Sequence, residues 1–385
     1  MIILEEPYIS QLLLDYLEES QIQVLSNTLS EHEYLRHNKL NVVDKKTFIA
    51  LYNTATPPRL YTVSEYALDW VCTVLQAEKL VEQIALLKDK VAFRKACSCI
   101  YEDLLFNEIS YTALFEFNIS EVHLPVVLKP SVGFLSAGVY TITNLDDWKN
   151  ALEDIQKNFL KLAGTFPDTV VGDACFILES YIHGREFAID LYFKEKEPVI
   201  INIFEHPFTS KEDVSDRLYI TNKTLFDDYL SMFTEHIARL NKVLNLSNIP
   251  IHMEIRVENG IIVPIEINPL RFAGLCLNEI HFYIAGQHPL SYFFSGTHPD
   301  YNAIWKGKES KTFSFSIIEK PEDSQNAALD IEKLKHEFSK ILEVRLVDSP
   351  KLNIFAFVFS EIETSNKMEL NNILNLDVTK LLNYK

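Results

Sequence analysis

Two glutamates and an asparagine recur on neighbouring segments that have the composition of β-strands. Residues 251–257 and 261–267 are rich in β-branched residues and flank an Asn-Gly pair, which is a strong signal for a β-hairpin. The hairpin, with the residue directly after it, carries two carboxylates and an amide that could bind a metal: Glu254, Glu266 and Asn268. Carboxylate and amide oxygens are ligands that Mg²⁺ accepts together with phosphate oxygens. The stretch therefore predicts a site for a hard divalent cation.

The length of the hairpin turn decides whether the two carboxylates face the same side. A two-residue turn would place Glu254 and Glu266 on opposite faces, because side chains alternate along a strand. A three-residue turn pairs residue 257 with 261 and residue 252 with 266, and it gathers the apolar side chains on one face. We therefore predict the three-residue turn. The polar face would then hold His252, Glu254, Arg256, Glu266 and Asn268, with Ile262 and Pro264 as its only apolar members.

A solvated polar face of a half-exposed sheet is the alternative to a metal site on this hairpin. His252 would lie on the same face, either as a general base or metal-site neighbour or with a purely structural hydrogen bond. Other segments must therefore decide between the two interpretations.

Composition excludes several classes of partner. The chain has 385 residues, of which 47% are hydrophobic, and this is enough for two or three domains with sizeable cores. Its net charge of −18, from 36 basic and 54 acidic residues, argues against nucleic acid and anionic membranes, which bind basic surfaces. No segment approaches 18 uncharged apolar residues, so we predict no membrane span.

The cysteines and the N-terminal residues predict the cellular compartment of the protein. Glu5 and Glu6 follow a very short apolar start, which does not resemble a signal peptide. The five cysteines are odd in number and lack zinc-site spacing. We expect them to be reduced in a cytoplasmic protein.

The first 88 residues alternate between strand and helix patterns. Residues 2–4 predict a short strand, and Ser10 predicts the cap of a helix that continues through Leu17. Thr62 and Glu65 have the spacing of a capping box ahead of another helix. This α/β region lacks a Gly-x-Gly-x-x-Gly motif, so we do not predict a dinucleotide site there.

A lysine and a loop rich in serine and glycine follow a strand of buried type. The strand of residues 124–130 contains Lys129, and the loop of residues 131–138 follows directly. Backbone N–H groups of such a loop can point at anionic oxygens. Gly133 and Gly138 have the spacing of a Walker loop, but Val139 stands where that motif requires lysine. An ordinary hairpin turn is the alternative.

Residues 176–193 read as two apolar strands around a polar hinge. Glu179 and Glu186 lie at the two ends of the hinge, and Gly184 lies at its turn. Backbone groups of the hinge could hydrogen-bond to a purine while a carboxylate holds ribose hydroxyls. On its own, this segment is also typical of a plain hairpin.

Four motifs in this order resemble the ATP-grasp superfamily of ATP-dependent carboxylate–amine ligases. They are Asp89-Lys90, Val127–Pro130 with the loop after it, Glu179-Ser-Tyr-Ile-x-Gly-x-Glu186, and Glu254 with Glu266-Ile-Asn268-Pro. The resemblance covers roughly residues 88–274 and implies a mixed α/β and α+β chain with an ATP-grasp fold. It implies a pre-ATP-grasp α/β domain at residues 1–88, an ATP-grasp domain of two subdomains at 89–300 and a small α+β extension at 301–385.

The resemblance also implies which residues bind ATP and its metal. Lys90 and Lys129 would hold the phosphates, and the loop would close over them. The remaining nucleotide contacts would come from Ser131, Gly133, Ser136 and Gly138 in the loop and from Glu179, Tyr181, Ile182 and Glu186 at the hinge. The ligands of Mg²⁺ or Mn²⁺ would be Glu254, Glu266 and Asn268.

One position departs from the family pattern. Family members often have Glu-x-Asn-Pro-Arg, whereas here Leu270 intervenes and Arg271 follows one residue late. Arg271 could still reach the transferred phosphoryl group or the substrate carboxylate, and Arg256 is the other candidate. We therefore expect Arg271, Arg256 and Lys129 to be the catalytic cations.

The implied reaction activates a small-molecule carboxylate as an acyl phosphate and joins it to an amine, with release of ADP and phosphate. An amino acid or dipeptide-like compound is the expected substrate. A nucleotide-binding scaffold or sensor without turnover is the alternative, and a biotin-type carboxylation with bicarbonate is a lesser one. The segment 205–219 is a candidate substrate loop with His206, Asp213, Asp216 and Arg217 as its polar groups. The region from residue 301 onward could be a lid or a homodimer surface.

Overall fold

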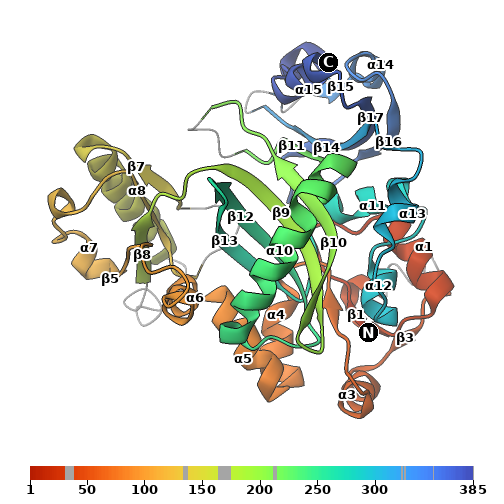
Figure 1. Cartoon of the computed structure of the whole chain (residues 1–385), viewed down its shortest axis with the longest axis horizontal. Coiled ribbons are helices and arrows are strands. Elements are labelled where there is room, and N and C mark those ends of the chain that lie inside the picture. Colours follow the sequence, from red (N-terminus) through yellow and green to blue (C-terminus); the bar gives the residue numbers. More distant parts are fainter. Residues whose placement is uncertain are drawn as a thin grey trace. The chain divides into compact units, whose positions relative to one another are not determined.

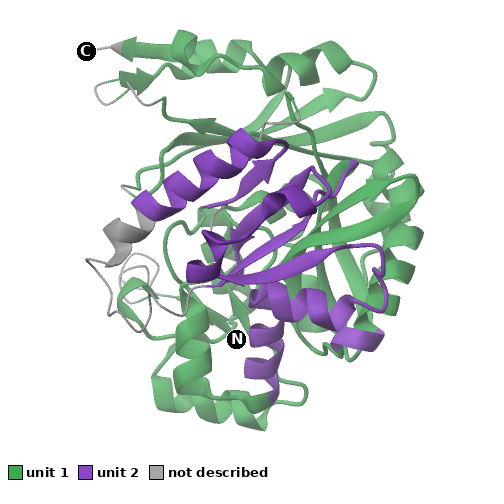
Figure 2. Cartoon of the chain, turned by 90° about the vertical axis from the view of Figure 1, so that its left-hand side faces the viewer, with its two compact units in different colours: residues 1–78, 185–241, 245–385 green, residues 79–184, 242–244 purple. Residues whose placement is uncertain are grey.

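The computed structural model describes residues 1–30, 39–132, 138–163, 175–210, 215–321, 324, 327–349 and 351–384. The chain forms two compact units, which Figure 2 colours separately. The larger unit comprises residues 1–78, 185–241 and 245–385, and the smaller unit comprises residues 79–184 and 242–244. Among the described helices, none combines the length and the apolar composition that crossing a bilayer requires. The predicted division into three domains stays a prediction.

The larger unit begins with a small parallel sheet whose strands lie in the order β3-β2-β1-β4. The strands are β1 (Ile2–Ile3), β2 (Val24–Leu25), β3 (Val42–Val43) and β4 (Tyr61–Thr62), and the helices between them include α1 (Gln11–Ser20) and α3 (Lys45–Thr54). The hydroxyl of Ser10 accepts a hydrogen bond from the Leu13 N–H at the start of α1. The predicted helix cap is therefore confirmed.

The predicted capping box at Thr62 and Glu65 is wrong. Helix α4 (Ala67–Trp70) starts after Tyr66 without a side-chain cap and continues as a π-helical turn, η1 (Val71–Leu75). The hydroxyl of Thr62 lies 3.5 Å from the Leu270 carbonyl instead. Glu65 pairs with Arg271, so a distant segment uses the side chain that the local pattern assigned to the helix.

An eight-stranded antiparallel sheet forms the centre of the larger unit, in the order β13-β12-β9-β10-β11-β14-β17-β16 (Figure 1). Its strands are β9 (Arg185–Lys194), β10 (Glu197–His206), β11 (Leu218–Asn222), β12 (Pro250–Glu258), β13 (Ile261–Pro269), β14 (Lys311–Glu319), β16 (Ile341–Leu346) and β17 (Ile354–Glu363). Helix α10 (Lys223–Leu244) crosses one face of this sheet. There the ring of Phe187 packs 4.6 Å from Tyr229 and 5.4 Å from Phe233, measured between centroids.

The hairpin of β12 and β13 turns through two residues, so the predicted three-residue turn is wrong. Glu258 pairs with Ile261. The two residues between them, Asn259 and Gly260, have φ angles of 50° and 79°. Positive φ at both central positions is typical of the type I′ turns that close two-residue hairpins.

A β-bulge brings the two glutamates back to the same face. Ile255 pairs with Pro264, but the next pair is Glu254 with Glu266, so Ile265 is an extra residue on β13. Directly paired residues share a face of the sheet. The expected proximity of Glu254 and Glu266 therefore holds, although the register behind the expectation does not.

The two-residue turn also moves two residues that we predicted on the polar face. Ile262 pairs with Val257 and Pro264 pairs with Ile255, so both lie on the apolar face. Ile262 is 5% exposed, whereas Ile261 at the turn is 66% exposed. Both residues lie between the turn and the bulge, so the two-residue turn alone reverses the face that a three-residue turn would give them.

Short helices follow β13, and the C-terminal strands extend the large sheet. The helices are η3 (Leu277–Glu279), α11 (Ile280–Ala285), α12 (Leu290–Ser295) and α13 (Tyr301–Trp305). The last segments are β15 (Ala327–Leu329), α14 (Ile331–His336), α15 (Lys367–Leu374), η4 (Val378–Leu381) and β18 (Leu382–Tyr384). Strands β14, β17 and β16 belong to the same sheet as the central hairpin.

The smaller unit is a four-stranded antiparallel sheet in the order β5-β8-β6-β7 with helices beside it. The strands are β5 (Phe106–Ser110), β6 (Val126–Pro130), β7 (Tyr140–Ile142) and β8 (Cys175–Ser180). The helices are α5 (Glu78–Lys88), α6 (Lys90–Cys97), α7 (Tyr111–Leu114), η2 (Ile119–Glu121) and α8 (Leu145–Ala163). Leu128, Ile142 and Trp148 belong to its apolar core.

Candidate active site

A buried ion cluster in the smaller unit contains the lysine that we predict as a phosphate ligand. The Nζ atom of Lys129 lies 2.6 Å from Oε1 of Glu179, and Nε of Arg94 lies 2.6 Å from Oε2 of the same carboxylate. Their side chains are 6%, 2% and 3% exposed, in the order Lys129, Glu179 and Arg94. Two cations and one anion are thus held away from solvent.

Strand pairing explains how Lys129 and Glu179 meet. Val127 on β6 lies opposite Glu179 on β8, and Lys129 is two residues beyond Val127, so all three point to the same face. Burial alone would raise the pKa of Glu179, but the charges of Lys129 and Arg94 lower it to about 2. Glu179 is therefore ionised at neutral pH, and the cluster is positively charged when Lys129 and Arg94 are both protonated.

Arg94 is a member of this cluster that the sequence motifs do not include. It lies on α6, four residues after Lys90, so the two side chains start from the same side of the helix. Its Nη1 atom is buried and has no hydrogen-bond acceptor among the described residues. A buried, unpaired guanidinium N–H beside Lys129 fits an anionic ligand such as a phosphate.

The start of α6 is held against the strand that carries Lys129. Asp89 caps the helix by accepting hydrogen bonds from the N–H groups of Val91 and Ala92. The N–H of Lys90 donates to the Ser131 carbonyl, and the N–H of Ser131 donates to the Cys175 carbonyl. These contacts bring the two predicted phosphate lysines, Lys90 and Lys129, into one unit.

The structure describes only part of the predicted phosphate loop and adenine hinge. Gly133 and Ser136 lie outside the described residues, whereas Gly138 has a φ of 76°, which favours glycine. The N–H of Tyr181 donates to the Pro125 carbonyl, so this group is already used within the unit. Ile182 follows directly, just beyond the end of β8.

The predicted metal ligands lie on the face of the large sheet that is opposite to α10. Glu254 pairs with Glu266 across the hairpin, and His252 pairs with Asn268. Partial removal of solvent raises the pKa of Glu254, and the negative charge of Glu266 raises it further. Two carboxylates in direct cross-strand positions repel each other. A divalent cation between them would remove that repulsion.

A buried aspartate links this face to the segment after β13. Asp190 on β9 is fully buried, and its Oδ1 lies 2.9 Å from Nδ1 of His252. The same oxygen accepts a hydrogen bond of 2.7 Å from the Ala273 N–H. Burial alone would lower the pKa of His252, but Asp190 and Glu254 raise it to about 9. His252 is therefore protonated at neutral pH and unsuited to act as a general base in this arrangement.

Arg256 and Glu186, two more predicted site residues, form an ion pair on the same face. The distance from Nε of Arg256 to Oε2 of Glu186 is 2.9 Å. Oε1 of Glu186 lies 3.2 Å from Nδ1 of His206, which stacks on the ring of Tyr219. Arg256 thus balances a neighbouring carboxylate in this structure.

A family model described as an ATP-grasp domain matches residues 122–279, which include parts of both units. The chain carries an ATP-grasp domain. The resemblance predicted from the four motifs is confirmed, as is the mixed fold of the ATP-grasp type. No curated protein matches the chain in sequence.

Several solved structures are similar to this chain over its whole length. An L-amino acid ligase from Bacillus licheniformis matches 100% of this chain and 98% of its own, with 16% identity and a TM-score of 0.69. The match to the biotin carboxylase of Campylobacter jejuni in a beta-gamma-ATP complex covers 100% of this chain and 91% of that chain, with 12% identity and a TM-score of 0.63. A third match is the biotin carboxylase domain of Hydrogenobacter thermophilus 2-oxoglutarate carboxylase, with MgADP and bicarbonate. It covers 100% of this chain and 90% of that chain, with 11% identity and a TM-score of 0.58. At these identities the likeness shows a shared fold.

Leu270, which separates Arg271 from the Glu-x-Asn-Pro motif, has a backbone conformation fixed by a tertiary contact. Leu270 is buried and has a φ of 63°, and its carbonyl accepts a 2.7 Å hydrogen bond from the Thr62 N–H. Arg271 then lies 3.4 Å from Glu65, measured from Nη2 to Oε1. With its amide nitrogen facing Glu65, Asn268 also hydrogen-bonds to Glu65 and Arg271. Glu65 therefore connects the late arginine to a predicted metal ligand.

The segment proposed as a substrate loop is only partly described. His206 is the last residue of β10 and is buried, so it belongs to the sheet. Asp213 lies outside the described residues. Asp216 accepts a 2.7 Å hydrogen bond from the Tyr219 hydroxyl, and Arg217 is exposed. The role of segment 205–219 in binding a substrate stays a prediction.

Three polar residues of these clusters escaped the sequence motifs: Arg94, Asp190 and Glu65. Arg94 had a usable signal, because it lies four residues after Lys90. Asp190 also had one, because it is an acidic residue between the apolar residues 187–189 and 191–193. Glu65 had none, because its partner Arg271 lies 206 residues away.

Proposed function

We propose that this ATP-grasp protein is an ATP-dependent ligase that activates a small-molecule carboxylate and joins it to an amine. The observation that carries the proposal is the direct pairing of Glu254 with Glu266, next to Asn268, on one sheet face. That face has the oxygen donors for a hard cation, while the smaller unit has the cations for phosphates.

The residues fit Mg²⁺ or Mn²⁺ as the partner of ATP. Among the described residues, no group of three or more His, Cys, Asp and Glu side chains is arranged to hold a metal ion. Two carboxylates and an amide suit a cation that takes its other ligands from phosphates and water. The metal would bind at Glu254, Glu266 and Asn268. When bound, it supplies positive charge where negative charge develops on phosphate oxygens.

Lys129 and Arg94 would act on the phosphates from the smaller unit. The unpaired Nη1 atom of Arg94 and the ammonium of Lys129 are both buried beside Glu179. Charge-assisted hydrogen bonds to phosphate are strong when the donors are shielded from water. Glu179 would hold both cations in position, and Lys90 at the start of α6 would add a further contact.

The reaction would proceed in two steps. A carboxylate oxygen of the substrate attacks the γ-phosphorus of ATP, the bond to the β–γ bridging oxygen breaks, and ADP leaves with the electron pair. The amine nitrogen then attacks the acyl carbon, phosphate leaves, and the nitrogen loses a proton. Such phosphoryl transfer requires positioning and charge stabilisation more than covalent help. Arg271, held by Glu65, is the candidate to orient the substrate carboxylate.

An amino acid or dipeptide-like compound is the proposed carboxylate. The similar structure with the highest TM-score cited above is named an L-amino acid ligase. Another similar structure is a biotin carboxylase domain in complex with MgADP and bicarbonate. The network of Asp190, His252 and Asn268 would place polar groups near such a substrate. A cytoplasmic location and a homodimer stay predictions.

The experiment is trapping of the acyl phosphate with hydroxylamine. The protein is incubated with Mg²⁺, ATP, pooled amino acids and hydroxylamine, and hydroxamate and ADP are measured together. Matching amounts of both products are expected from the wild-type protein, and Glu266→Gln should lose both. Glu258→Gln is the matched control, because Glu258 is exposed at the end of the same hairpin. ADP formation that survives Glu266→Gln would contradict the metal assignment.

A further inference from the structure

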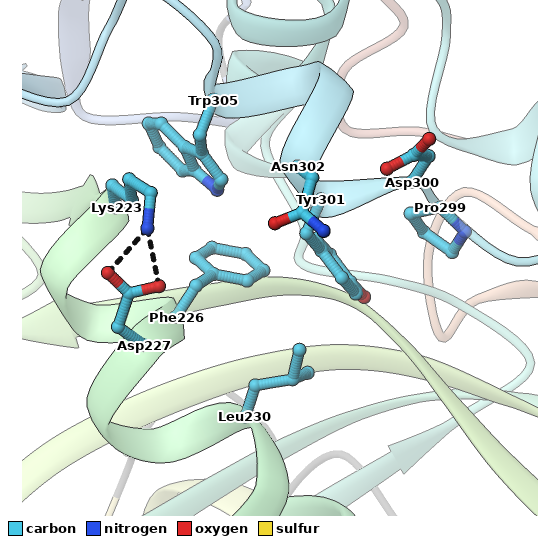
Figure 3. A pocket seen from close by; sticks show the side chains of 9 residues that line it. All are labelled: Lys223, Phe226, Asp227, Leu230, Pro299, Asp300, Tyr301, Asn302 and Trp305. Atoms are coloured by element: carbon cyan, nitrogen blue, oxygen red, sulfur yellow. Dashed lines mark hydrogen bonds and ion pairs between the residues drawn. The ribbon is translucent and has the colours of Figure 1, made fainter.

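A pocket lies in the larger unit between α10 and α13 (Figure 3). It has a volume of about 490 Å³, which is in the range of small-molecule sites. Its wall combines three aromatic rings with charged side chains: Phe226, Tyr301, Trp305, Lys223, Asp227 and Asp300.

This pocket is separate from the candidate active site. Its lining residues Phe226 and Asp227 belong to α10, which packs against Phe187. Glu186 and Glu254 lie on the opposite face of the sheet, because side chains alternate along a strand and Glu186 is adjacent to Phe187. The sheet therefore stands between the pocket and the paired carboxylates.

Trp305 contributes a polar group that the protein leaves unsatisfied. The side chain is almost completely buried, with 2% exposure. Its indole N–H has no hydrogen-bond acceptor among the described residues. In Figure 3 the indole nitrogen lies on the side of the ring that faces Phe226 and Tyr301. Buried polar groups are nearly always paired, so this donor indicates an acceptor that comes from outside the chain.

The aromatic rings beside this donor form an apolar wall, in which the ring of Phe226 is tilted by 55° to that of Trp305 and by 43° to that of Tyr301. The ring centroid of Phe226 lies 5.4 Å from that of Trp305 and 4.9 Å from that of Tyr301. The hydroxyl of Tyr301 is directed away, because it donates to the Ile200 carbonyl. The pocket thus offers ring faces to a ligand, which suits an aromatic or branched apolar group.

The rim of the pocket carries an ion pair that a ligand can open at low cost. Both carboxylate oxygens of Asp227 lie 2.6 Å from Nζ of Lys223. The side chain of Lys223 is 29% exposed and that of Asp227 is 58% exposed. Ion pairs in such exposed positions contribute little to stability. Each charge can therefore exchange its partner for a ligand group.

We propose that this pocket binds a free amino acid with an aromatic or branched apolar side chain. The ammonium group would pair with Asp227, and the carboxylate would accept hydrogen bonds from Lys223 and from the indole N–H of Trp305. An amino acid carries both charges on one carbon, so it can insert into a single lysine–aspartate pair without changing the net charge. Its side chain would lie on Phe226 and Tyr301.

The proposal goes beyond the ligase activity, because it assigns a second site to a different face of the sheet. The test is calorimetric titration of the full-length protein with L-phenylalanine, without ATP. We expect saturable binding with a Kd of about 1 mM or tighter. Phenylalaninamide, which lacks the carboxylate, and 3-phenylpropionate, which lacks the ammonium group, should not bind.

Variants distinguish this pocket from other sites. Asp227→Asn and Trp305→Phe should each weaken binding by about tenfold or more. Asp228→Asn is the matched control, because Asp228 is exposed on the same helix and does not line the pocket. Because Asp227 is exposed, Asp227→Asn tests the proposal even if Trp305→Phe folds poorly.

Glu266→Gln separates the second site from the active site, since binding at the pocket should survive a change that removes the ligase reaction. The proposal is overturned if L-phenylalanine shows no saturable binding. It is also overturned if Asp227→Asn and Trp305→Phe bind as tightly as Asp228→Asn, or if Glu266→Gln abolishes the binding.

Discussion

Two polar clusters, one in each unit, hold their carboxylates in opposite electrostatic environments. In the smaller unit, Glu179 lies between Lys129 and Arg94, and its pKa falls to about 2. In the larger unit, Glu254 lies opposite Glu266, and its pKa is raised.

This difference shows which kind of ion each cluster can bind. The first cluster contains its own cations and a surplus donor, so it suits an anion. The second gathers negative charge that protonated His252, 3.6 Å from Glu254, offsets only in part. It therefore suits a cation.

Removing Glu179 should produce the largest loss of stability. Glu179→Ala leaves Lys129 and Arg94 buried without their shared counter-charge, which should lower the free energy of unfolding by about 3–5 kcal/mol. Urea unfolding measures the loss. Glu108→Ala is the matched control, because Glu108 pairs with Lys95 in an exposed position and its loss should be barely measurable. Equal losses in the two variants would show that the buried cluster is not special.

The register of the hairpin that carries the paired carboxylates predicts the next effect. Ile262→Ala should cost about 2–5 kcal/mol, because this side chain is buried on the apolar face. Ile261→Ala should stay within about 0.5 kcal/mol, because Ile261 is exposed at the turn. Thermal unfolding of both variants tests the two-residue turn. The reverse order of effects would restore the three-residue turn and remove the bulge.

Sequence reasoning found the motifs but not the geometry that joins them. Lys129 and Glu179 could be predicted because each belongs to a short motif near the end of a strand. The hairpin of residues 251–267 could be predicted from its Asn-Gly turn. The bulge at Ile265 was not visible, because alternation alone does not count an extra residue.

Long-range partners account for the remaining misses. The pairing of Glu65 with Arg271 depends on how the N-terminal sheet meets the segment after β13, which no local pattern encodes. The fixed φ of Leu270 likewise follows from its tertiary contact with Thr62. In both places tertiary contacts overrode the local motif.

Acid should weaken the cluster around Glu179. Its pKa is about 2 in the folded protein against an ordinary value of 4.5, so the folded state favours the ionised form. This contribution to stability is complete above about pH 4.5 and is lost as the pH falls toward 2. Urea unfolding from about pH 6 down to about pH 3 should show a steeper loss for the wild type than for Glu179→Gln. Parallel curves would contradict the depressed pKa.

Removing one of the paired carboxylates should produce the smallest change, and with the opposite sign. Without metal or nucleotide, Glu266→Gln relieves the repulsion of Glu254 and should stabilise the protein by about 0.2–1 kcal/mol. Added Mg²⁺ and ATP should stabilise the wild type and have less effect on this variant. Destabilisation of the metal-free protein by Glu266→Gln would mean that the two carboxylates do not repel each other.

The most direct test of the contrast between the two clusters is metal binding by the paired carboxylates. Calorimetric titration with Mn²⁺ in the presence of a non-hydrolysable ATP analogue would compare the wild type, Glu266→Gln and Glu258→Gln. Our account predicts that Glu266→Gln weakens Mn²⁺ binding by about tenfold or more, while Glu258→Gln leaves it unchanged. Equal Mn²⁺ affinity in all three proteins would contradict it.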